Sequence, residues 1–191
     1  MKLSLYAILL ACCSGAALAA PATYTVDPDH TYPHFEVDHF GGMSVWRGLF
    51  KETSGTVVLD REAKIGSVEI VVNTGSVEFG NAKLNEHVVG PKMLDSAKFP
   101  VATYTGKLVD FKDGAPTAVD GTFTLHGITH PLVLKINSFK CVQHPIFKRE
   151  FCGADAIGTF QRDEYGVSAG KDYGFKQDVL LRIQIEALKQ D

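Results

Sequence analysis

The stretch Asp178-Val179-Leu180-Leu181-Arg182-Ile183-Gln184-Ile185-Glu186 decides the fold class of this chain. Apolar side chains at positions 179, 181, 183 and 185 alternate with polar ones, and this period of two predicts a half-buried β-strand. The same alternation recurs around Val68, Phe123 and Leu134. The strands expected from such runs are 22–27, 33–40, 44–59, 66–79, 100–111, 117–126, 129–140, 153–162 and 176–188, with merging or splitting of two of them allowed.

Turn signals separate these runs at fairly regular intervals, as at Gly41-Gly42 and His126-Gly127. One region breaks the pattern: residues 81–96 indicate one or two short helices, with Asn81 as an N-cap and Pro91 in the first turn of the second. Many strands with regular turns favour an all-β sandwich or barrel, which composition does not separate. A closed sheet of about eight strands has an interior that can hold one small ligand.

The first residues have the pattern of a secretory signal peptide. Lys2 precedes an apolar run over 3–10, and Ala17-Leu18-Ala19 forms an A-x-A cleavage signal. We therefore expect a cleaved signal peptide at 1–19 and one exported domain at 20–191, in the periplasm or secreted. The alternative is a lipoprotein cleavage box ending at Cys12, although Leu10 is an unusual residue there.

The bulk composition excludes several classes of partner. The formal net charge is −3, and loss of Lys2 with the signal peptide makes it more negative. Nucleic acids and anionic membrane surfaces both require a basic face, so neither is expected as a partner. The apolar run is far shorter than the ~20 residues of a membrane span, and we expect no stable membrane insertion. Hydrophobic residues make up 45% of the chain, which is ample for a core.

Two cysteines remain after signal cleavage, Cys141 and Cys152. An even pair in an exported protein predicts a disulfide, which would close a loop of about 12 residues and contribute roughly 3 kcal/mol. A metal or redox pair is the alternative, although the spacing is not that of a C-x-x-C motif.

The histidines offer a second metal hypothesis, because His30, His34 and His39 fall within ten residues. Residues 30 and 34 share one face of a strand whereas 39 points to the other, so a three-histidine site requires a bend, and structural hydrogen bonding is the simpler interpretation. His126 and His130 flank a tight turn and are explained by a hairpin. No nucleophile motif or phosphate loop is present, so we predict no catalytic residues and no catalytic cofactor.

Aromatic residues are the more informative group. Phe35, Val37 and His39 alternate on one strand, and Trp46, Gly48 and Phe50 alternate on the next. Phe79, Phe99, Tyr104, Phe111 and Phe123 extend the set. A packed core accounts for them, and the sharper hypothesis is that some line a tunnel, with small residues such as Gly48 and Gly55 leaving the space.

Several ordered segments resemble the YceI-like family, and the match is collinear over nearly all of 22–188. The segments are 24–31 (YTVDPDHT), 35–42 (FEVDHFGG), 46–50 (WRGLF), 85–88 (NEHV), 93–95 (MLD), 99–100 (FP), 119–131 (VDGTFTLHGITHP) and 158–166 (GTFQRDEYG). The resemblance implies an eight-stranded, antiparallel, lipocalin-like β-barrel with one or two short helices covering one end. It also implies a bacterial periplasmic or secreted protein that binds an amphiphilic isoprenoid-type lipid: an isoprenoid quinone, a polyprenyl lipid or a fatty chain. The sequence gives no clear oligomeric signal, and the resemblance is compatible with a homodimer.

The resemblance also assigns residues to the lipid site. Phe35, Val37, His39, Trp46, Phe50, Phe79 and Phe123 are expected to face the tunnel, with Asn85 and His87 on the helical lid near the head group. The family commonly has arginine where Val89 stands, and its loss favours a neutral head group over a phosphorylated one. The rival functions are a small periplasmic hydrolase or isomerase using His39 and His87 as acid and base, or a histidine-rich metal-binding protein.

Overall fold

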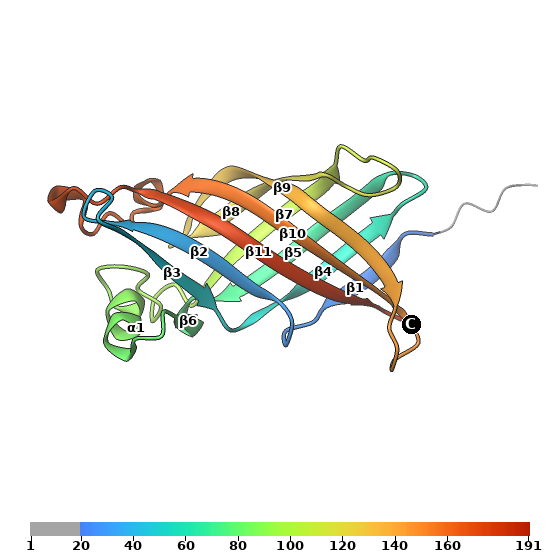
Figure 1. The fold of residues 1–191 in the computed structure, drawn as a ribbon, viewed down its shortest axis with the longest axis horizontal. Coiled ribbons are helices and arrows are strands. Elements are labelled where there is room, and N and C mark those ends of the chain that lie inside the picture. Colours follow the sequence, from blue (N-terminus) through green and yellow to red (C-terminus); the bar gives the residue numbers. More distant parts are fainter. Residues whose placement is uncertain (1–19) are drawn as a thin grey trace, which may run out of the picture.

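The alternating segments pair into one antiparallel sheet in the computed structural model, which describes residues 20–191. Figure 1 shows the sheet wrapped around a long axis. The strands are β1 (Ala22–Val26), β2 (Tyr32–His39), β3 (Ser44–Phe50), β4 (Thr53–Asp60), β5 (Ile65–Asn73), β6 (Val77–Glu78), β7 (Val101–Val109), β8 (Ala118–Leu125), β9 (Ile128–Gln143), β10 (Glu150–Gln161) and β11 (Asp178–Lys189). The predicted signal peptide and Cys12 lie outside the described residues.

The sheet closes into a ring in the order β1-β4-β5-β7-β8-β9-β10-β11, because β11 also pairs with β1. The predicted eight-stranded antiparallel barrel is therefore confirmed, and a sandwich is excluded. Residues 187–189 of β11 pair with β1, whereas residues 179–184 pair with β2. β1 and β2 thus occupy one place in the ring, and β3 and β6 extend the wall on the β2 side.

Two predicted strands are interrupted in the structure. The run 44–59 breaks at residues 51–52 into β3 and β4, and the run 66–79 is divided by the short 3₁₀ helix η1 (Thr74–Ser76). Side-chain hydrogen bonds explain the second break, since Thr74 Oγ1 donates to the Phe99 carbonyl at 2.7 Å and Ser76 Oγ donates to the Asn73 carbonyl at 2.7 Å. The bond between Ser76 and Asn73 is local, and local side-chain bonds of this kind compete with the ladder of the sheet.

The helical prediction for 81–96 is realised as one α-helix, α1 (Ala82–Val89). Asn81 is its N-cap and accepts a hydrogen bond from the Leu84 N–H at 3.2 Å. The second helix, predicted from Pro91, does not form; the Met93 and Asp95 N–H groups both donate to the Gly90 carbonyl, which produces turns. α1 lies at the end of the barrel where β3 and β6 end (Figure 1).

The inward faces of the strands build two clusters of buried side chains, one in each half of the barrel. The cluster at the β1 end includes Tyr24, Leu59 and Ala187. The cluster at the α1 end includes Phe35, Val88, Leu94, Tyr165 and Val179. Because the closed sheet has inner and outer faces, the period of two in the sequence fixes which side chains enter the barrel.

Candidate functional site

A cavity of about 540 Å³ occupies the interior of the barrel. β11 shows how its wall is built: every second residue from Val179 to Ala187 lines the cavity. The middle three of these, Leu181, Ile183 and Ile185, point inward and yet are only half-buried. Their side chains keep accessible surface because the space beside them is open. The barrel is therefore hollow along this strand rather than filled by side chains.

Small residues on β10 help to leave this space. Ala154 and Ala156 both line the cavity, and Ala154 is paired across the sheet with Phe139 and Ile185. The two glycines to which the sequence prediction gave this role act differently. A Cβ at Gly48 would lie 2.6 Å from Phe35 Cζ, and one at Gly55 would lie 2.1 Å from a backbone oxygen. Neighbouring atoms already occupy the space beside both glycines, so neither glycine leaves room for a ligand.

The two ends of the cavity differ in exposure. At the β1 end the lining consists of buried residues such as Tyr24, Leu59, Cys152 and Ala187, which close the barrel. At the α1 end the lining reaches His87, whose side chain is exposed, together with Trp46 and Phe175. The cavity therefore opens at the end of the barrel where α1 lies (Figure 1).

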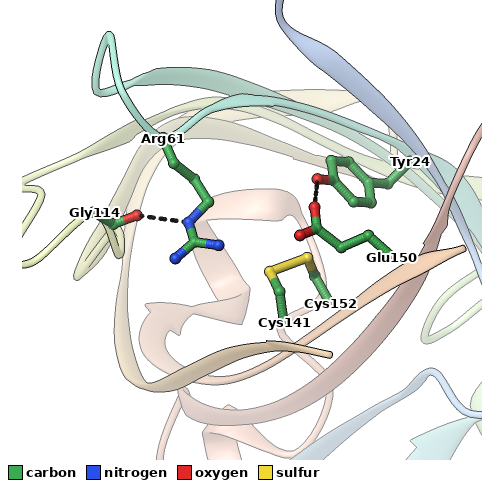
Figure 2. The surroundings of a disulfide bond; sticks show 6 residues. All are labelled: Tyr24, Arg61, Gly114, Cys141, Glu150 and Cys152. Carbon is green, nitrogen blue, oxygen red and sulfur yellow. Dashed lines mark hydrogen bonds between the residues drawn. A yellow bond between two sulfur atoms is a disulfide. The ribbon is translucent and has the colours of Figure 1, made fainter. Parts of the chain in front are cut away.

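A disulfide joins β9 and β10 at the closed end, as predicted. Cys141 and Cys152 lie directly opposite each other in the sheet and are bonded. Figure 2 shows the disulfide beside Tyr24, whose hydroxyl donates a hydrogen bond to Glu150. Among the described residues, the disulfide sulfurs and Glu150 form the one compact group with metal-ligand atoms, but sulfurs bonded to each other are not thiolate ligands.

The tyrosines of the wall are neutral and internally paired. Burial, followed by the hydrogen bond to Glu150, raises the pKa of the Tyr24 phenol above its ordinary value. Burial also raises the pKa of Tyr104, whose hydroxyl donates to the Leu132 carbonyl at 3.0 Å. These hydroxyls have their polar partners within the wall, so the middle and the closed end of the cavity are suited to an apolar chain.

The structure brings eight of the nine predicted lipid-site residues to the cavity wall. They are Phe35, Val37, His39, Trp46, Phe50, Phe79, His87 and Phe123. Asn85 is the exception, since its side chain lies outside the lining. Its Oδ1 accepts from the Phe79 N–H at 2.9 Å, and its Nδ2 donates to Glu78 at 2.8 Å. Asn85 therefore fastens α1 to β6 and has no direct access to the cavity.

The histidines do not assemble into the alternative sites. His30 bonds Asp27, His34 bonds the Tyr32 carbonyl, and His39 packs against aromatic rings that include Trp46. Within residues 20–191, no metal-type group contains these histidines. Nor does any carboxylate in this part of the chain hydrogen bond to His39 or His87, as an acid–base pair would require.

The wall residues that the sequence reasoning did not assign to the lipid site include Ala154, Ala156 and Arg162. All three lie on the inward register of β10 and its continuation, which begins at Cys152 and includes Phe160. Counting every second residue from Cys152 would have found them. Arg162 falls at the open end, where its side chain bonds the Val167 carbonyl, and Val167 and Phe175 also line the cavity.

The closed barrel and its apolar cavity, which opens at one end, define a lipocalin-like ligand-binding barrel. No helix within residues 20–191 is long and apolar enough to cross a membrane. The model of the YceI-like domain matches residues 24–187, and the chain belongs to this family.

Relatives cover almost the whole chain. A UPF0312 protein of Pectobacterium atrosepticum is 30% identical over 190 residues, which are 98% of this chain and 96% of that protein. Protein YceI of Salmonella arizonae is 29% identical over 179 residues, which are 93% of this chain and 91% of that protein.

Solved structures share the fold at lower identity. BcnA of Burkholderia cenocepacia has a TM-score of 0.67 at 19% identity, covering 85% of this chain and 99% of its own. A polyisoprenoid-binding domain of Saccharophagus degradans has a TM-score of 0.63 at 17% identity, covering 87% of this chain and 98% of its own.

Proposed function

We propose that this protein binds a single amphiphilic, isoprenoid-type lipid inside its barrel and carries it in the periplasm without catalysing a reaction. The proposal rests on one observation: the inward apolar side chains of Leu181, Ile183 and Ile185 are only half-buried, beside a cavity of about 540 Å³. Apolar surface left inside a protein is stabilised when an apolar chain covers it. The relative described as a polyisoprenoid-binding domain supports the same class of ligand.

Burial of the chain supplies enough free energy for binding. An isoprene unit brings about five methylene-sized groups, and at ~0.8 kcal/mol each its burial contributes roughly 4 kcal/mol at most. Association and ordering of the chain subtract several kcal/mol in total. A tail of a few units therefore binds tightly through the apolar wall, while groups at the opening set the orientation of the lipid.

The periplasmic location is part of the proposal. The disulfide between Cys141 and Cys152 suits an oxidising compartment. The A-x-A pattern at Ala17-Leu18-Ala19 supplies the export signal. The carrier role, rather than an enzymatic one, is supported by a wall whose polar groups are few and whose histidines lack carboxylate partners among residues 20–191.

Native mass spectrometry of protein purified from the periplasm tests the proposal. We expect an adduct of several hundred daltons that organic extraction releases and that lipid analysis identifies as an isoprenoid amphiphile. Ile183→Glu places a charge in the cavity wall, and Gln184→Glu places the same charge on the exposed neighbour. The first variant should lose the adduct and the second should retain it.

Two results would contradict the carrier. One is a wild-type protein of unliganded mass that also fails to bind added isoprenoid lipids. The other is retention of the adduct by a folded Ile183→Glu variant, which would place the lipid outside the barrel.

A further inference from the structure

Arg162 is a buried cation at the open end of the cavity. Arg162 follows β10 and begins the 3₁₀ helix η2 (Arg162–Tyr165). The residue is 7% exposed and lines the cavity. It is the one lysine or arginine in the lining formed by residues 20–191. A charge removed from water is costly unless a partner compensates for it, so the surroundings of this guanidinium are informative.

The partners available within the described part of the chain leave most of the guanidinium unused. Nη1 donates to the Val167 carbonyl at 2.7 Å, which accounts for one of its five N–H donors. Among residues 20–191, no carboxylate lies within ion-pair distance of Arg162. The guanidinium thus has one side-chain hydrogen bond, to a backbone oxygen, and belongs to a residue of the cavity lining.

The neighbouring carboxylates are already engaged elsewhere. Asp163 pairs with Lys171 Nζ at 2.6 Å. Asp38, the carboxylate in the lining, accepts the N–H groups of Gly41 at 2.9 Å and Lys176 at 3.0 Å. Burial lowers the pKa of Arg162, while the charges of Asp163 and Asp38 act in the opposite direction. Asp163, which follows Arg162 in the chain, and Asp38 in the lining are therefore both engaged with donors other than the guanidinium.

We propose that Arg162 binds an oxyanion on the lipid, so that the ligand is an amphiphile with a phosphate or carboxylate head group and its chain in the apolar cavity. The geometry combines a fixed guanidinium at the open end with an apolar wall beyond it, and planar guanidinium groups bind phosphate and carboxylate through paired hydrogen bonds. This inference rests on the proposed lipid-binding function and replaces the neutral head group expected from the sequence at Val89.

Titration of delipidated protein with farnesyl phosphate and farnesol tests the inference, because the two probes share one tail. Palmitate and hexadecanol form a second pair that separates a carboxylate from a phosphate source. Calorimetry reports the affinities, and emission of the single Trp46, which lines the cavity, reports entry of the ligand. We expect at least one anionic probe to bind roughly ten- to a hundredfold more tightly than its alcohol.

The variants assign this preference to the residue. Arg162→Gln should bring the ratio of the two affinities close to one, and Arg162→Lys should keep part of it. Arg182→Gln, which removes an exposed arginine from the outer face of β11, should leave the ratio unchanged. A structural role of Arg162 alone would alter the melting temperature without altering this ratio.

The outcomes are separable from failure of the proposed function. If alcohols and anions bind equally to the wild type, the head-group inference is wrong while lipid binding stands. The same holds if folded Arg162→Gln keeps the preference. If none of the four probes binds, both proposals fail. The comparison of anionic and alcohol probes on the wild type requires no substitution. It can therefore contradict the inference even if a variant folds poorly.

Discussion

Filling the cavity from its own wall is the sharpest test of a hollow barrel. Ala154 is half-buried and lines the cavity, between the half-buried side chains of Phe139 and Ile185 on the neighbouring strands. The substitution Ala154→Phe places a ring at this point. Thr159→Phe, on the same strand but with an exposed, outward side chain, is the matched control.

The structure sets the size of the expected effect. A phenyl ring occupies about the space of one isoprene unit, so the lipid loses roughly 4 kcal/mol of burial at ~0.8 kcal/mol per methylene. At 1.4 kcal/mol per factor of ten, this is an upper limit of roughly a thousandfold in Kd. A chain that bends around the ring recovers part of that loss, and we therefore expect a weakening of at least about tenfold.

Stability provides a second, independent readout. In a packed interior the added ring would cost about 1–3 kcal/mol through overpacking. In a hollow one it enters open space, and the melting temperature should stay level or rise. Isoprenoid titrations and thermal denaturation of Ala154→Phe and Thr159→Phe measure both effects. A folded Ala154→Phe protein that binds lipid as tightly as the control would refute the reasoning, as would a clear loss of stability.

Three further outcomes follow from the described contacts. Reduction of the Cys141–Cys152 disulfide should lower the free energy of unfolding by about 2–4 kcal/mol in urea titrations, and an unchanged midpoint would contradict this. Gly48→Ala places a methyl carbon 2.6 Å from a packed ring and should cost about 1–3 kcal/mol, whereas a level melting temperature would show that the ring moves freely. The pKa of Glu78 is lowered, first by the amide of Asn85, so its contribution to stability is complete above about pH 4.3 and is lost as the pH falls through the lowered pKa. Glu78→Gln should flatten that part of the pH profile of the melting temperature, and a profile identical to the wild type would exclude the contact as its cause.

Particular elements show how far the sequence could be read. The alternation over 178–186 predicted β11 and its inward face, because a strand has only two faces and one of them had to be apolar. Asn81 was recognised as a helix N-cap from its residue type and position. Of the one or two helices predicted for 81–96, the second one, at Pro91, does not form, since the N–H groups of Met93 and Asp95 both bond the Gly90 carbonyl in turns.

The site was less accessible to sequence reasoning. Periodicity gives the direction of Ala154 but not whether space or a facing side chain lies opposite. Gly48 leaves no space because the ring of Phe35 lies beside it, and Asn85, expected near the head group, bonds the carboxylate of Glu78. Both contacts join residues that are separated in the sequence, so the local pattern does not show them. Arg162 looked like one residue of a family motif until its burial and its cavity position were known.

The amino-acid order by itself determined an all-β chain with a defined inner face, a short helix and a pair of cysteines, because these features depend on local periodicity, capping and composition. The tertiary structure decided that β11 meets β1 to close the ring, that the interior stays open, and that a lone guanidinium sits at its entrance. Those three properties depend on which residues, far apart in the chain, face one another across the barrel. Such residues are brought together only when the sheet has closed.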